Sequence, residues 1–301
     1  METDKAAESA HSQRNWYDKS YKILLLIPII LVALSLLYLV FFYIEHGDIV
    51  LKDASLSGGT TITIRGEADS DLLENSLKSE FDDIYVRKIT DLRTGRLIAV
   101  VIDSGIEPEL LKPAVEKILG YKLNSDNSTV EFTGPSLSNN FYKQLLVALL
   151  FSFILICIVI FSLFRTLIPS LAVIFAVIGD IIMPLALINF LGINLSAAGI
   201  AAFLMLIGYS VDTDILLTTR VLKKREGSVN ERIYGAFKTG MFMTIVGLLA
   251  VLPAFFIVTG LPDSFRQIFL ILSMGLFADI LNTWLTNASI LKWYTEVKKH
   301  G

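Results

Sequence analysis

The chain has 301 residues and a formal net charge of −3, and 53% of its residues are hydrophobic. Soluble globular proteins have about 45–50% apolar residues, and the excess here is gathered in long runs that are typical of membrane spans. The small net charge excludes the basic field that favours nucleic-acid binding. The single cysteine, Cys157, excludes an intramolecular disulfide and is interpreted as a small hydrophobic side chain.

Residues 1–22 are polar, and we expect them to form a tail in the cytoplasm. The first apolar run, 23–44, has a length of about 22 residues, which exceeds the apolar core of about 7–15 residues in a signal peptide. No small-x-small cleavage site follows it. We therefore predict that residues 23–44 form the first transmembrane helix.

The next segment, 45–140, is charged, contains several glycines and has no long apolar run. Its pattern predicts strands and helices in the order βαββαβ, which is the order of a ferredoxin-like α+β domain. The elements are expected at Thr60–Arg65, Asp69–Phe81, Ile84–Ile89, Arg96–Ile102, Glu109–Leu119 and Thr129–Phe132, with a hairpin turn at Asp91–Gly95. Pro113 argues against an unbroken second helix and favours a helix that begins at this proline.

Five further apolar runs predict transmembrane helices 2–6 within residues 141–292. The runs are Leu145–Phe164, Leu167–Leu191, Ile193–Leu217, Gly240–Val258 and Ile268–Leu291. Lys and Arg gather in the loop 220–238 and in the tail 293–301, whereas the connections at Gly192 and 259–264 contain neither. The positive-inside rule then predicts a multi-pass protein of the cell membrane, with both termini cytoplasmic and the 45–140 domain on the outer side.

Carboxyl groups inside the apolar runs are the main candidates for function. Asp180 lies in the third span, Asp212 and Asp214 lie in the fourth, and Asp279 lies in the sixth. A charged residue at mid-membrane is unfavourable by about 2.5–3.5 kcal/mol on insertion scales, so each needs a reason to be there. All three histidines lie outside the apolar runs, which leaves carboxyl groups as the carriers of any intramembrane proton chemistry.

Helical spacing places small or polar residues beside two of these acids. Gly208 shares a face with Asp212, and Gly275 and Asn282 share a face with Asp279. Small residues beside an acid favour close packing of helices around a polar seam. Asp214 is about 200° from Asp212 on the same helix, so the two acids cannot face one partner.

Two interpretations of the acids remain open. They form hydrogen bonds or ion pairs that fix the packing of helices, in which case Asp214 pairs with Arg220 or Lys224. Alternatively, they form a path of groups that take up and release protons. Lys238, at the entrance of the fifth span, is either a membrane anchor or a counter-charge to one of the acids.

Motifs for enzymatic chemistry are missing from the sequence. It contains no G-x-x-x-x-G-K-[ST] loop, no H-E-x-x-H motif and no paired cysteine ligands. We therefore expect no enzymatic activity, no ATP hydrolysis by the chain itself and no bound cofactor or metal.

Three short motifs and the six-span plan resemble the SecD/SecF family of protein-export membrane proteins, within the resistance-nodulation-division superfamily. Residues 57–60 (SGGT) are similar to the family's F-x-G-G-T, residues 133–137 (TGPSL) to V-G-P-S-L, and residues 208–212 (GYSVD) to G-Y-S-V-N-D. Arg220 holds the place of the arginine that closes the last motif. The chain has Asp212-Thr213 where bacterial SecF proteins have Asn-Asp, which resembles the archaeal type, and Lys238 where the family carries an arginine.

The resemblance implies an accessory subunit of the Sec protein translocase that, with SecD, promotes preprotein export by means of the proton gradient. Its partners would be SecD, the Sec translocon channel, the preprotein and the lipid bilayer. We expect Asp212 to be the switching acid, turned into the bundle, with Asp279 and Lys238 coupled to it and Asp180 secondary. Two alternatives remain open, a half-size ion-coupled exporter of small molecules and a non-transporting scaffold of the translocon.

Overall fold

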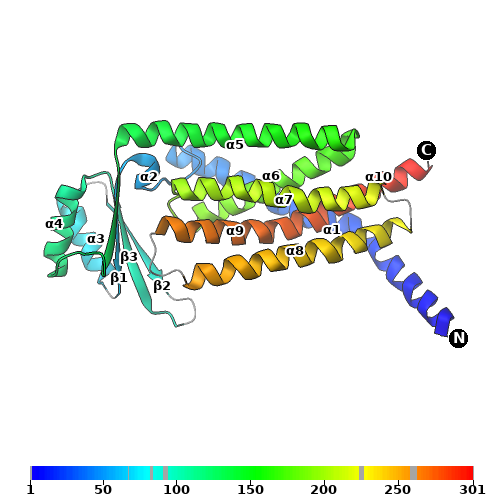
Figure 1. The fold of residues 1–301 in the computed structure, drawn as a ribbon, viewed down its shortest axis with the longest axis horizontal. Coiled ribbons are helices and arrows are strands. Elements are labelled where there is room, and N and C mark those ends of the chain that lie inside the picture. Colours follow the sequence, from blue (N-terminus) through cyan, green and yellow to red (C-terminus); the bar gives the residue numbers. More distant parts are fainter. Residues whose placement is uncertain are drawn as a thin grey trace.

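In the computed structural model, the described residues are 2–66, 68–81, 84–90, 94–223, 227–257 and 263–300. Six helices among them are long and apolar enough to cross a membrane. They lie side by side along the long axis of the molecule, with a small sheet domain at one end and both chain ends at the other (Figure 1). The spans lie within α1 (Glu2–His46), α5 (Pro135–Phe164), α6 (Leu167–Phe190), α7 (Ala197–Lys223), α8 (Val229–Ile257) and α9 (Asp263–Leu281), which continues through the π-helical segment η1 (Asn282–Asn287) into α10 (Ala288–His300). The predicted fold class, six spans with one α+β domain between the first two, is confirmed.

The sheet domain has the expected βαββαβ order. Its strands are β1 (Gly59–Arg65), β2 (Ile84–Thr90), β3 (Leu97–Ser104) and β4 (Ser128–Thr133), and its helices are α3 (Ser70–Glu80) and α4 (Pro108–Leu119), with the one-turn α2 (Ala54–Ser57) before β1. The strands pair antiparallel in the order β2-β3-β1-β4. This order places α3 and α4 on the same face of the sheet.

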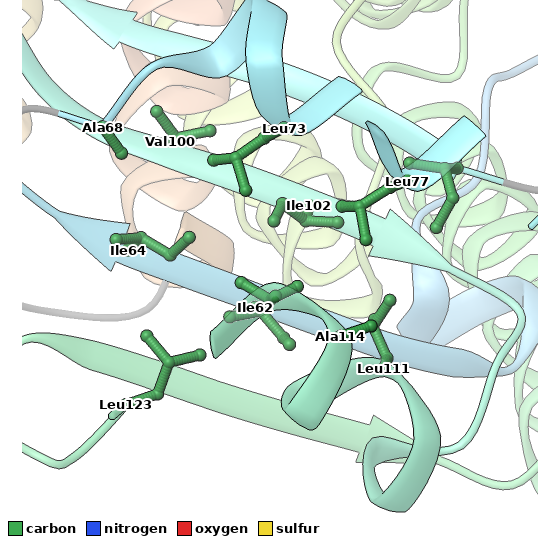
Figure 2. Close-up of a cluster of buried hydrophobic side chains, with 12 residues drawn as sticks. Ile62, Ile64, Ala68, Leu73, Leu77, Val100, Ile102, Leu111, Ala114 and Leu123 are labelled. Atoms are coloured by element: carbon green, nitrogen blue, oxygen red, sulfur yellow. The ribbon is translucent and has the colours of Figure 1, made fainter. Parts of the chain in front are cut away.

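Apolar side chains fill the space between the sheet and its two helices. Leu73 and Leu77 of α3 and Leu111 of α4 lie against Ile62 and Ile102 of the two central strands (Figure 2). Residues two apart on a strand share a face, so the opposite face of β1 carries Thr61 and Thr63, which are also buried. That second face is turned toward the helix bundle.

Two boundaries differ from the sequence-based expectations. Helix α4 runs through Pro113, and Pro108 takes the place at its start. A proline in the second turn removes only one N–H bond, and the burial of Leu111 and Val115 offsets that loss. Helix α7 begins at Ala197 and not at Ile193.

The residues before α7 are extended because they bond to other parts of the chain. Leu195 forms an isolated parallel bridge with Lys52, and the Gln267 amide donates to the Asn194 carbonyl at 2.6 Å. The N–H of Ser196 donates to the Gln267 side-chain oxygen at 2.9 Å. At the other end of the chain α1 extends through the expected polar tail. Residues 91–93 of the expected hairpin turn lie outside the described residues.

Candidate functional site

The most buried spans of the bundle are α6, α7 and the helix formed by α9, η1 and α10. Between them lies a connected group of polar side chains that includes three fully buried acids, Asp180, Asp214 and Asp279. We call this group the polar seam. It consists of Asp180 on α6, Ser210, Thr213 and Asp214 on α7, Thr244 on α8, Asp279 on α9, and Asn282, Thr283 and Asn287 on η1.

Asp279 lies at the centre of the polar seam. Its Oδ1 atom lies 2.8 Å from the Thr213 hydroxyl and 2.9 Å from the Thr283 hydroxyl. Its Oδ2 atom lies 3.5 Å from the hydroxyl of Thr244. Asp279 therefore joins α9 to both α7 and α8 through hydroxyl groups.

Asp214 is the second acid of the seam. Its Oδ1 atom accepts from the Asn287 amide at 2.7 Å and lies 3.0 Å from the Thr283 hydroxyl. Its Oδ2 atom is buried and has no hydrogen-bond partner among the described residues. Thr283 thus lies between two carboxyl groups, those of Asp214 and Asp279.

Asp180 is the third acid. It accepts hydrogen bonds from the Ser210 hydroxyl and, at 2.7 Å, from the Asn282 amide. Asn282 lies so close to α6 that a Cβ atom on Gly179 would be 2.6 Å from the Asn282 nitrogen. Through Ser210, Asp180 joins α6 to α7, and through Asn282 it joins α6 to η1.

The π-helical segment η1 places three amide and hydroxyl groups in this seam. A π-helix forms i→i+5 bonds in place of i→i+4 bonds, and such segments occur often at functional sites. Asn282 and Asn287, five residues apart, both point inward and reach different acids. Thr283 and Thr286 are also fully buried.

The hydroxyl contacts of the seam outnumber its hydroxyl protons. Each threonine hydroxyl carries one proton, yet Thr213 lies 2.8 Å from both the Ser210 carbonyl and Asp279. Thr283 likewise lies within 3.0 Å of both Asp214 and Asp279. A proton on Asp279 or Asp214 would supply the donor that such a contact lacks.

Within the part of the chain that the structure describes, basic side chains do not neutralise the seam. No salt bridge between described residues involves any of its three acids. Among the same residues, no group of three or more His, Cys, Asp or Glu side chains is arranged to hold a metal ion. Burying ionisable groups without a counter-charge is costly, and such groups within a membrane span mark candidate functional sites.

The placement of Asp212 differs from the sequence-based expectation. Its side chain is exposed on the outer surface of α7, together with Gly208 and Met205. Nothing lies within 4 Å of the position that a Cβ atom on Gly208 would take, so this glycine packs against no other described helix. The expectation that Asp212 points into the bundle is wrong for the chain by itself, because α7 turns the opposite face, with Thr213 and Asp214, toward α9.

The other candidates divide between the seam and the surface. Asp214 does not pair with Arg220, whose guanidinium donates to the Gly235 carbonyl of α8, and Lys224 lies outside the described residues. Lys238 is exposed on α8. Gly275 lies at a close approach of α9 to α7, because a Cβ atom there would be 2.2 Å from Leu206.

Sequence reasoning named Asn282 but missed the other hydroxyl and amide members of the seam. Thr283 and Asn287 follow Asp279 at intervals of four residues, which is a helical-face signal. Thr213 lies between the two acids of α7 and was not considered beside them. Single hydroxyl groups are common in apolar runs, because each can donate a hydrogen bond to a backbone carbonyl of its own helix.

Comparison with known proteins places these features in a family context. A family model described as "Protein export membrane protein SecD/SecF, C-terminal" matches residues 114–297. The protein-export membrane protein SecF of Methanolacinia petrolearia is 37% identical over 91% of this chain and 93% of the relative. SecF of Methanothermobacter thermautotrophicus is 38% identical over 93% of this chain and 94% of the relative.

A solved structure has the same fold. The crystal structure of SecDF, a translocon-associated membrane protein from Thermus thermophilus, matches 93% of this chain with a TM-score of 0.74 and 17% sequence identity. A second SecDF structure, in a super-membrane-facing form, matches 94% of this chain with a TM-score of 0.58. The present chain spans 38% of the length of the first of these chains.

Proposed function

This chain belongs to the SecD/SecF family of protein-export membrane proteins, and from that premise we propose that it works with a SecD partner to promote preprotein export by means of the proton gradient. The observation that carries the proposal is the polar seam, in which three carboxyl groups are buried and two of them, Asp214 and Asp279, share the Thr283 hydroxyl. No salt bridge between described residues involves any of the three. Buried ionisable groups within a membrane span are a hypothesis of function by default.

The proposed orientation puts the sheet domain outside the cell. Lys and Arg gather in the connection 220–238 and beyond the sixth span, and the positive-inside rule assigns those segments to the cytoplasm. Both ends of the chain lie at that same end of the bundle, opposite the sheet (Figure 1). In this orientation the sheet domain meets the preprotein as it emerges from the translocon channel.

The outer face of α7 is the proposed contact with SecD. Asp212 lies there beside Gly208 and Met205, all three of them exposed. A carboxyl group in hydrocarbon is unfavourable by about 2.5–3.5 kcal/mol, and a small residue beside it allows a second helix to approach closely. We infer that a SecD helix faces α7 at this position.

A change of protonation in the seam would move helices against each other. Thr283 belongs to η1 and lies between Asp214 on α7 and Asp279 on α9. Loss of a proton from either acid leaves two acceptors facing one hydroxyl donor, and the two helices then repel at that point. Because α7 begins at the sheet domain, a shift of α7 reaches the outer side of the membrane.

The test is preprotein export in proteoliposomes that contain the translocon, the SecD partner and this chain, with and without an imposed proton gradient. Asp279→Asn and Asp214→Asn are expected to abolish the stimulation by the gradient, while the chain still folds and assembles. Asp71→Asn, a surface acid of the sheet domain that pairs with Lys88 at 2.9 Å, is the matched control and should keep full stimulation.

Two outcomes would contradict the proposal. Full stimulation in both seam variants, with loss only when the whole chain is omitted, indicates the non-transporting scaffold. Gradient-driven movement of small molecules by the chain without SecD or translocon indicates the half-size exporter. Asp212→Asn tests the outer face of α7 independently of the polar seam, because it should weaken export only when SecD is present.

A further inference from the structure

The segment that enters the sheet domain is bound directly to the start of α7. Residues 51–53 run beside Leu195, and Lys52 forms the isolated parallel bridge with Leu195. The N–H of Asp53 donates to the Leu195 carbonyl at 3.0 Å, and the N–H of Leu195 donates to the Leu51 carbonyl at 2.6 Å. This places the side chains of α2 against the first turn of the helix that carries Asp214.

Ser55 forms the contact itself. Its hydroxyl donates to Asp53 Oδ1 at 2.6 Å and accepts the N–H of Ala197, the first residue of α7, at 2.9 Å. The first N–H groups of a helix have no partner within the helix, so Ser55 supplies one from a different part of the chain. Asp53 Oδ1 also accepts the N–H of Ser55 at 2.9 Å and thereby fixes the orientation of the hydroxyl.

Asp53 lies in a buried place that contains a second acid. Asp53 is 5% exposed, and Asp103 on β3 is 3% exposed. Asp103 binds Arg87 of β2 at 2.9 Å and accepts from the Thr61 hydroxyl at 2.7 Å. From the bundle side, the Asn194 amide donates to Asp103 at 3.2 Å.

Few charges act on Asp53 in this place. On the sheet side the charged groups are Asp103 and Arg87, and on the bundle side the neighbouring groups at 194–197 and Gln267 are uncharged. Lys52, the preceding residue, is occupied by Asp48 at 2.7 Å. Burial raises the pKa of Asp53 from 3.8 to about 7, and the charge of Asp103 adds to this, whereas the Ser55 hydrogen bonds and Arg87 oppose it.

We propose that Asp53 and Ser55 form a proton-sensitive latch that fixes the start of α7 to the sheet domain when Asp53 is protonated and releases it when Asp53 is ionised. A protonated Asp53 keeps its carbonyl oxygen as the acceptor for Ser55. An ionised Asp53 places a second negative charge beside Asp103 in a buried site, and this charge is relieved when the 51–57 segment separates from α7 and water enters.

The direction of the pH dependence follows from the raised pKa. The closed latch binds the proton of Asp53 more tightly than the open latch does, so closure is favoured in acid. The stabilisation is complete below the ordinary pKa of 3.8 and is lost as the pH rises toward the raised value of about 7. The contacts of the latch come from the geometry of Asp53, Ser55 and Ala197, and only its use in export rests on the proposed function.

The test is hydrogen–deuterium exchange of the full chain in lipid nanodiscs, read on peptides that cover residues 193–200. After correction for the intrinsic exchange rate, protection should fall by about tenfold or more between pH 5.5 and pH 8.5, as a raised carboxyl pKa requires. Asp53→Asn keeps the carbonyl acceptor and has no charge, so it should show the acidic value at both pH values.

Two further variants sharpen the result. Asp48→Asn, which alters the neighbouring acid bound to Lys52, should leave the pH dependence of the peptide unchanged. Asp103→Asn removes the facing charge and should move the midpoint to lower pH. Equal protection of the native chain at both pH values, or an unchanged pH dependence in Asp53→Asn, would overturn the latch. Because the experiment needs neither preprotein nor gradient, its failure leaves the proposed function standing, and the reverse also holds.

Discussion

The sheet domain and the helix bundle place apolar and polar residues in opposite ways. In the sheet domain, apolar side chains such as Ile62, Leu73 and Ile102 form one buried cluster between the sheet and its two helices (Figure 2). In the bundle the centre holds carboxyl, amide and hydroxyl groups, while large apolar side chains such as Leu37 and Phe242 are exposed on the outside. The two regions of the chain therefore differ in which side chains they bury at their centres.

The difference follows from the solvent around each region. Water around the sheet domain drives apolar side chains inward at about 25 cal/mol per Å² of buried apolar area. Lipid gives no such drive between helices, so close contact and hydrogen bonds hold the bundle together. The sheet domain should accordingly be most sensitive to lost volume, and the bundle most sensitive to lost space and lost polar partners.

The largest effect on stability is expected from a cavity in the sheet domain. Ile102→Ala should lower the free energy of unfolding of the domain by about 2–5 kcal/mol, because Ile102 is fully buried between the sheet and α3. Hydrogen exchange of β1 and β3 peptides in the full chain measures this. Tyr85→Ala, on the exposed edge strand β2, is the control and should change the stability by about 0.5 kcal/mol or less. Equal losses in the two variants would contradict the contrast drawn here.

A smaller effect is expected when a methyl group is added inside the bundle. Gly179→Ala places a Cβ atom 2.6–2.9 Å from three atoms of the Asn282 amide, so the Asn282–Asp180 hydrogen bond must shift. We expect a loss of about 1–3 kcal/mol, the usual effect of overpacking. Thermal unfolding of the detergent-solubilised chain measures it. Gly208→Ala, where nothing lies within 4 Å, should be neutral or stabilising, since alanine favours helix more than glycine does.

These two regions also differed in how far the sequence predicted them. In the sheet domain, short runs of strand-forming or helix-forming residues bounded by turn residues indicated all six elements to within a few residues. Pro113 was misjudged because the apolar face of α4 outweighs one missing hydrogen bond. Ile193 was misjudged because an apolar residue next to a span is equally compatible with helix and with the extended segment that Leu195 forms with Lys52.

The interior face of α7 could not be predicted in the same way. Both faces of a membrane helix are apolar, so hydropathy identifies the span but not which side meets other helices. Asp212 and Asp214 were correctly placed on different faces by their spacing, yet the choice of the inward one depends on Thr283 and Asn287, which lie about 70 residues away. A contact between distant segments leaves no local trace in one sequence.

A still smaller effect on stability is expected from the seam variant Asp214→Asn. Asparagine keeps the oxygen that accepts from Thr283 and Asn287, and its amide nitrogen replaces an oxygen that already lacks a partner among the described residues. The free energy of unfolding should therefore change by about 1 kcal/mol or less, within the net value of one hydrogen bond. A loss beyond about 3 kcal/mol in thermal unfolding would indicate a structural ion pair and would weaken the case for a proton-coupling role.

The smallest effect is expected from Asp212→Asn in the isolated chain, about 0.5 kcal/mol or less, because this side chain is exposed and has no partner among the described residues. The same variant should destabilise the complex with SecD, which can be measured as a lower midpoint for dissociation of the pair in detergent. A large change in the isolated chain would mean that Asp212 binds within its own bundle. No change in the complex would mean that the outer face of α7 is not where SecD binds. Asp214 on the inward face and Asp212 on the outward face of one helix thus allow the two proposed roles to be tested separately.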